Sequence, residues 1–147
     1  MYLGDRLGAR PTNANCYDGG HVNFEYLART EEFRLGLDRL IKTASEYRLA
    51  MMCAEKEPLH CHRCILICRN LRDRTLSIKH ILADGTIEDH ADTERRLVKM
   101  LKIEPTLFEP QTTRADLIEQ AYDRQAGNIS HNSETQETGA AHDTPKP

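Results

Sequence analysis

The sequence contains no tryptophan and few other aromatic residues, with five Tyr and three Phe among 147 residues. Hydrophobic residues make up 39% of the chain, which is enough for one modest core in one compact domain. No run approaches the roughly 20 apolar residues that a membrane-spanning helix needs. Residues 1–6 also lack the long apolar core of a secretory signal. The composition therefore predicts a soluble protein with no membrane partner.

The sequence also lacks an excess of positive charge and a spread disulfide framework. The formal net charge is -3, which does not indicate a nucleic-acid partner. Of the five cysteines, an odd number, four fall within residues 53–68. Such crowding is not typical of a disulfide-stapled secreted domain, so we expect a reducing, cytoplasmic location. Nothing in the sequence indicates an oligomeric state.

Helices and strands are expected to alternate in the middle of the chain. After a glycine-rich opening, Thr30 is placed to cap a helix over residues 31–46. The uncharged run that ends at Cys53 favours a strand over 48–53, buried on both faces as in a parallel sheet, although helix propensity also permits helix. Helical spacing resumes over 62–72, and alternation over 76–82 predicts a second strand.

Strand, helix and strand within about 35 residues predict a βαβ unit. Asp84-Gly85 then gives a turn, and a further amphipathic helix is expected over 90–101. The fold class is therefore predicted to be α/β, a three-layer Rossmann-like parallel sheet reduced here to a βαβ core with flanking helices.

The chain is expected to divide into three parts. Residues 1–103 form the α/β domain, and residues 104–127 form a linker with a short helix that begins at Thr113 and carries Asp116 at the capping-box position. Residues 128–147 contain almost no apolar side chains, so they are predicted to be a disordered tail. An interaction role for this tail is supported only by its predicted disorder.

The residues with catalytic potential gather in the loop that follows the first predicted strand. In open parallel sheets, ligands lie beyond the carboxyl ends of the strands, against helix N-termini. The candidate catalytic residues in that place are Cys53, Glu55, Cys61, His62 and Arg63. A thiol beside a histidine and an arginine can have a lowered pKa, and an arginine can bind a phosphate or carboxylate. The pattern thus favours an enzyme-like site for an anionic ligand, with a phosphate- or nucleotide-like small molecule as partner.

Zinc binding and a purely structural role are the alternatives. Cys61, Cys64 and Cys68 lie too far apart along a regular helix to share one ion, so Cys64 and Cys68 are expected in the core. A site made of Cys53, Cys61 and His62 is geometrically easier, and a Cys-x-x-Cys redox pair at 61–64 has no other support. We assign no metal and no cofactor from the sequence.

The residues just described resemble the bacterial domain of unknown function 488 family. The resemblance rests on residues 51–63 (MMCAEKEPLHCHR) and 79–85 (KHILADG), preceded by 2–8 (YLGDRLG) and 26–33 (YLARTEEF). It covers roughly residues 2–102 and implies a three-layer α/β domain in which the five candidate residues correspond to the family motif. It implies no activity.

The resemblance also implies that two N-terminal strands of the family domain, one near a Gly-His-Ser motif and one with Asp-Val-Arg, are missing here. A two-stranded parallel sheet leaves unpaired edges, so we expect a truncated and marginally stable fragment. The predicted function is that of an uncharacterised protein of this type with an anionic-ligand site. A zinc-binding or structural module, even a non-functional fragment, is the alternative.

Overall fold

The structure, a computed structural model, describes residues 1–105 and 111–130. The helices are α1 (Gly4–Leu7), η1 (Ala14–Cys16), α2 (Phe24–Arg29), α3 (Glu31–Glu46), η2 (Pro58–His60), η3 (Arg63–Cys68), η4 (Arg69–Leu71), α4 (His90–Met100) and α5 (Arg114–Ile129). The strands are β1 (Tyr17–Asp18), β2 (His21–Val22), β3 (Lys79–Ile81) and β4 (Ile87–Asp89). No helix within the described part of the chain is long and apolar enough to cross a membrane.

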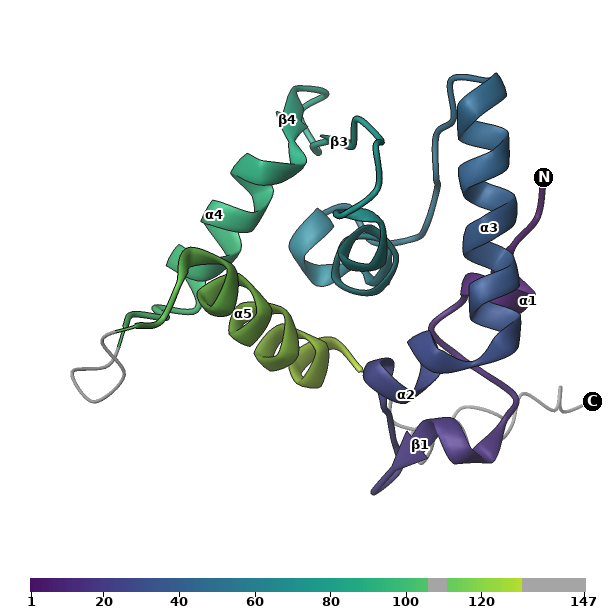
Figure 1. The fold of residues 1–147 in the computed structure, drawn as a ribbon, viewed down its shortest axis with the longest axis horizontal. Coiled ribbons are helices and arrows are strands. Elements are labelled where there is room, and N and C mark those ends of the chain that lie inside the picture. Colours follow the sequence, from purple (N-terminus) through teal and green to yellow (C-terminus); the bar gives the residue numbers. More distant parts are fainter. Residues whose placement is uncertain (106–110, 131–147) are drawn as a thin grey trace, which may run out of the picture.

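The helical segment η2–η4 lies in the middle of the molecule. Figure 1 shows it in teal, viewed nearly end-on, with α3 on one side and α4 and α5 on the other. Its apolar side chains supply much of the core, and they pack with buried residues from the surrounding helices. The fully buried large side chains include Phe33, Leu59, Ile65, Leu66, Leu71, Leu97 and Tyr122. A helix in the centre of the fold therefore takes the place that a sheet holds in a layered α/β domain.

The predicted parallel sheet is not found among the described residues. Both sheets are two-stranded and antiparallel, β1 with β2 and β3 with β4. Residues 48–53, predicted as a buried strand, form no strand and pair with none in the described ranges. Leu49 is exposed and Met52 is 95% exposed. The uncharged run suggested burial on both faces, but within this segment only Met51 and Cys53 are even partly buried.

The second predicted strand belongs to a hairpin rather than to a βαβ unit. β3 pairs with β4 with His80 opposite Glu88, and the chain reverses through the Asp84-Gly85 turn. Gly85 has a φ of 85°, which only glycine adopts readily, and Asp84 accepts hydrogen bonds from the Thr86 backbone and hydroxyl. The turn was correctly predicted, but the antiparallel hairpin that it forms was not. An Asp-Gly pair between alternating residues is a hairpin signal.

The predicted helices are confirmed, with changes at their ends. Thr30 caps α3 by accepting a hydrogen bond from the Phe33 backbone at 3.3 Å. Thr113 and Asp116 form the expected capping box at the start of α5. This helix continues to Ile129 and therefore includes the first two residues of the predicted tail. Residues 131–147 lie outside the described part of the chain.

The segment predicted as a helix over 62–72 is helical but not a regular α-helix. Residues 63–68 form a π-helix, and a 3-10 turn over Arg69–Leu71 follows. π-helical turns are rare and are found frequently at functional sites. All five residues from Cys64 to Cys68 are buried, so the prediction that Cys64 and Cys68 lie in the core is confirmed.

Candidate functional site

A fixed turn brings the two halves of the candidate site together. Residue Pro58 is buried at the start of η2, and the Glu57 side chain caps this turn by accepting a hydrogen bond from the Leu59 backbone at 3.1 Å. Leu59 is fully buried, and its carbonyl accepts a hydrogen bond of 2.7 Å from the Gln125 side chain of α5. The chain reverses over this anchored turn, so the residues before it face those that begin η3.

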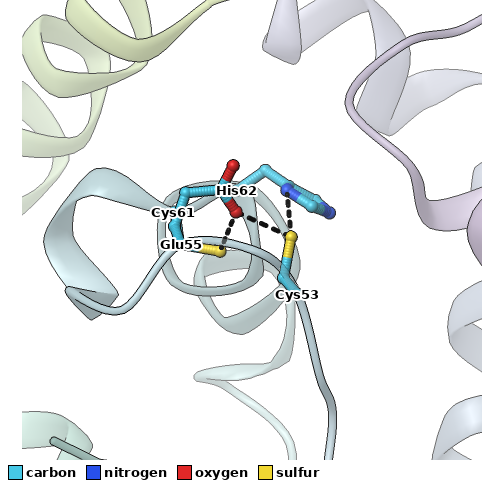
Figure 2. Close-up of side chains that lie close together, drawn as sticks. All are labelled: Cys53, Glu55, Cys61 and His62. Atoms are coloured by element: carbon cyan, nitrogen blue, oxygen red, sulfur yellow. Dashed lines mark hydrogen bonds between the residues drawn. The ribbon is translucent and has the colours of Figure 1, made fainter. Parts of the chain in front are cut away.

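The side chains of Cys53, Glu55, Cys61 and His62 point toward one another, as Figure 2 shows. The Cys53 thiol donates to Glu55 Oε2 at 2.7 Å, and its Sγ lies 3.6 Å from His62 Nδ1. The Cys61 thiol donates to the same Glu55 oxygen at 3.4 Å. One donor atom from each of the four residues lies within 4.8 Å of the other three. Four residues from one short stretch thus surround a single point.

Arg63 donates hydrogen bonds to Cys61 of this cluster and to the backbone of the segment before it. Its Nε donates to Cys61 Sγ at 3.0 Å, and its two terminal nitrogens donate to the carbonyls of Met51 and Glu55 at 3.2 and 2.6 Å. A guanidinium offers donors in a rigid planar fork, which allows these contacts to form together. Arg63 therefore connects residues 51–55 to the start of η3. With these donors engaged inside the protein, it is poorly placed to clamp an incoming anion.

The local environment sets the protonation of the cluster. Burial is the main cause that raises the pKa of the Cys61 thiol to about 11, against the lowering effect of Arg63. The pKa of Glu55 is lowered, chiefly by its hydrogen bond with Cys53, and burial lowers the pKa of His62. At neutral pH, Cys61 is a thiol, Glu55 a carboxylate and His62 a neutral imidazole. Cys61 does not have the lowered pKa that a thiolate nucleophile needs.

All five candidate residues from the sequence are thus placed side by side. Cys61 is fully buried, Cys53 and His62 are partly buried, and Glu55 is exposed. Their proximity follows from a turn before a helix, as expected, although no parallel strand precedes it. The catalytic role suggested for them remains a prediction.

Sequence reasoning missed a second cluster, which is formed by His80, His90, Tyr122, Glu94 and Arg72. His80 Nε2 lies 2.9 Å from His90 Nδ1, and the opposite nitrogen of His90 lies 3.2 Å from the Tyr122 hydroxyl. That hydroxyl donates to Glu94 at 3.1 Å, and Glu94 pairs with Arg72. His80 falls within the strand predicted over 76–82 and His90 at the start of the helix predicted over 90–101, and nothing in that prediction placed the two side by side. The Asp84-Gly85 hairpin was the signal that could have brought the two histidines together.

The two histidines make the stability of the metal-free protein sensitive to acid. Burial is the largest cause that lowers the pKa of each ring to about 4, and for His80 the neighbouring His90 adds to it. Since both values lie below the usual 6.5, the unfolded chain takes up protons first. The stabilisation is therefore complete above pH 6.5 and is lost as the pH falls toward 4, on the order of 3 kcal/mol for each ring.

Urea unfolding at pH 7 and pH 4.5, with a chelator present, measures this loss. His80→Gln is expected to remove a large part of the pH dependence, whereas substitution of the exposed His60 by Gln keeps all of it. Identical pH dependence in the wild type and in His80→Gln would show that the histidine pair does not carry the effect.

Comparison with known proteins gives one family match. Residues 3–69 match a family model described as Domain of unknown function DUF488. This confirms, over that stretch, the resemblance drawn from the sequence, and the stretch includes the whole cluster from Cys53 to Arg63. No curated protein and no solved structure gave a significant match.

Proposed function

We propose, from the premise that residues 3–69 are a DUF488-type region whose name records no activity, that this region binds a zinc ion through Cys53, Glu55, Cys61 and His62. The observation that carries the proposal is the mutual distance of the four donor atoms, all within 4.8 Å. Two ligands of one tetrahedral zinc ion lie about 3.4–3.8 Å apart, given usual zinc–ligand bond lengths. The side chains therefore need only small movements to close on an ion.

The chemistry of the donors also supports zinc. Two sulfurs, one imidazole nitrogen and one carboxylate oxygen are the ligand types that zinc takes in proteins. His62 presents Nδ1 to the cluster, and a neutral imidazole is the form that binds metal. Binding would release the two thiol protons, which would lower the pH of a weakly buffered solution. The negative charge of the ionised Glu55 carboxylate attracts a cation to the cluster.

Zinc would have a definite structural effect here. Residues 48–53 have no strand partners in the described ranges, and apart from the turn their attachment to η3 depends on Arg63 and on the Cys53 contacts. A metal ion bound by residues before and after the η2 turn would lock this segment in place. Four protein ligands are typical of a structural zinc site.

The test is the zinc content of the purified full chain. Wild-type protein is expected to retain one more equivalent of zinc than the double variant Cys53→Ala/Cys61→Ala, and Cys61→Ala alone is expected to weaken binding more than about a hundredfold. Cys16→Ala is the matched control, because Cys16 is equally buried but lies outside the cluster. Equal zinc content in the wild type and the double variant would refute the site.

A second candidate function is a thiol site for an anionic, phosphate- or nucleotide-like ligand. The observation in its favour is the Arg63 Nε–H bond to Cys61 at 3.0 Å, which places a guanidinium directly beside a sulfur. The carboxylate of Glu55 and the internal bonds of Arg63 both weaken anion binding. Thiol labelling between pH 5 and 9 separates the two candidates. One fast-reacting cysteine in zinc-free protein supports the anion site, and thiols protected until zinc is removed support the metal site.

A further inference from the structure

Cys64 lies close to the two histidines of the second cluster, so that three metal-binding side chains from separate parts of the chain come together. Cys64 belongs to η3, His80 to β3, and His90 is the first residue of α4. One donor atom of each lies within 4.8 Å of the other two. Cys64 and His90 are buried, and His80 is partly buried. None of these residues belongs to the cluster around Cys53, so the two groups share no donor atom.

A hydrogen-bonded outer layer orients His90 toward the centre of this cluster. Its Nε2 lies 3.2 Å from the Tyr122 hydroxyl and 3.6 Å from Glu94 Oε1. Because the Tyr122 hydroxyl donates its own proton to Glu94, it accepts one from His90 Nε2–H. The lone pair of His90 is then on Nδ1, which faces His80. Metal-binding histidines almost always donate their second ring nitrogen to such a partner.

We propose that Cys64, His80 and His90 form a second metal site, for zinc or a similar borderline-soft divalent cation, with water or a small anion as fourth ligand. One thiolate and two neutral imidazoles leave a divalent ion with a net charge of +1, so the open position favours an anion. On binding, the cation takes the place of the Cys64 thiol proton, which passes to the buffer. The proton between the two rings moves to His80 Nδ1, which frees Nε2 for the ion and keeps both imidazoles neutral. Three protein ligands with one open position are typical of zinc sites that act on bound molecules.

Such an ion would add a direct link between the hairpin and the central helix. Within the described residues, the β3–β4 hairpin is joined to α4 by the His90 backbone bond to Ile78 and by the contacts of Glu88 with Thr93 and Arg96. Cys64 lies in the central helix, so a shared ion would fix the hairpin against the middle of the fold. The site would be reached from the His80 side, where the cluster is least buried.

The test is a titration of the metal-free full chain with Co²⁺, whose visible spectrum reports tetrahedral geometry and thiolate ligation. The wild type is expected to bind two ions, and the folded variant Cys53→Ala/Cys61→Ala one, with the spectrum of a single thiolate. Cys64→Ala is expected to lose the second ion. Cys68→Ala is the matched control, since Cys68 is equally buried on the same helix but lies outside both clusters, and it is expected to keep both.

Two outcomes would overturn the second site. One is that the folded Cys53→Ala/Cys61→Ala variant binds no Co²⁺, and the other is that Cys64→Ala binds as many ions as the wild type. If Cys64→Ala does not fold, His80→Gln on the partly exposed strand serves instead, with the same expected loss of one ion. A wild type that binds one ion, retained in Cys53→Ala/Cys61→Ala but lost in Cys64→Ala, would support this site and refute the site at Cys53.

Discussion

Removal of zinc from the purified protein is expected to lower its free energy of unfolding by about 4 kcal/mol for the ion proposed at Cys53, relative to protein at a free zinc concentration a thousandfold above the dissociation constant of that site. For a chain of this length, that change corresponds to a fall in melting temperature of roughly 10 °C. The physical reason is that the proposed ion would bind only the folded arrangement of Cys53, Glu55, Cys61 and His62, because the unfolded chain does not hold these residues together.

Thermal unfolding with chelator, followed by addition of zinc, measures this effect. Addition of Mg²⁺ instead should not restore the melting temperature, because hard cations prefer oxygen ligands over sulfur. The triple variant Cys53→Ala/Cys61→Ala/Cys64→Ala should show no response to zinc. A wild-type protein whose melting temperature is the same with chelator and with zinc would contradict the expectation.

Substitution of Glu94 by Ala is expected to reduce the free energy of unfolding by about 3–5 kcal/mol, the usual cost of breaking a buried ion pair by removing one partner. The Glu94 side chain is only 10% exposed and pairs with Arg72 at 3.2 Å. It also accepts the hydrogen bond from the Tyr122 hydroxyl at 3.1 Å, and Tyr122 is completely buried. The substitution leaves that hydroxyl without this acceptor and Arg72 with Glu119 as its remaining partner.

Asp123→Ala is a matched control for this substitution. Asp123 pairs with Arg69 at 2.7 Å on the facing helix α5, but its side chain is 67% exposed. Solvent screens such a pair, so its removal should cost less than about 1 kcal/mol. Urea unfolding of the two variants compares a buried and an exposed carboxylate of the same kind. Equal losses would show that burial of Glu94 does not determine its contribution.

The location of the candidate site could be predicted from local sequence signals. Cys53 ends the first predicted strand and Cys61 precedes the predicted helix over 62–72, so both were expected beyond the carboxyl end of a parallel strand. The described residues contain no such sheet, and the anchored turn at Pro58 brings the two cysteines together instead. The roles of the side chains could not be read in the same way. Arg63 was expected to face a ligand, but its donors meet the backbone carbonyls of Met51 and Glu55, which the chain brings beside the start of η3. That contact depends on the path of the backbone.

The sheet was predicted wrongly because strand pairing is a property of two segments. Residues 48–53 have the apolar composition of a buried strand, yet composition does not show whether a partner strand lies beside them. The second cluster escaped prediction for a related reason. The approach of His80 to His90 requires the hairpin register, and the approach of Cys64 to both requires the irregular helix η3.

The π-helical turn over residues 63–68 restricts insertions and deletions in this part of the chain. An ordinary α-helix advances about 100° around its axis with each residue, so removal of one residue from this turn would rotate everything before it relative to everything after it. Exchange of one apolar residue for another within the turn keeps this rotation, but insertion or deletion of a single residue does not. Natural variation in this stretch should therefore be limited to changes of residue type at constant spacing between Arg63 and Leu71.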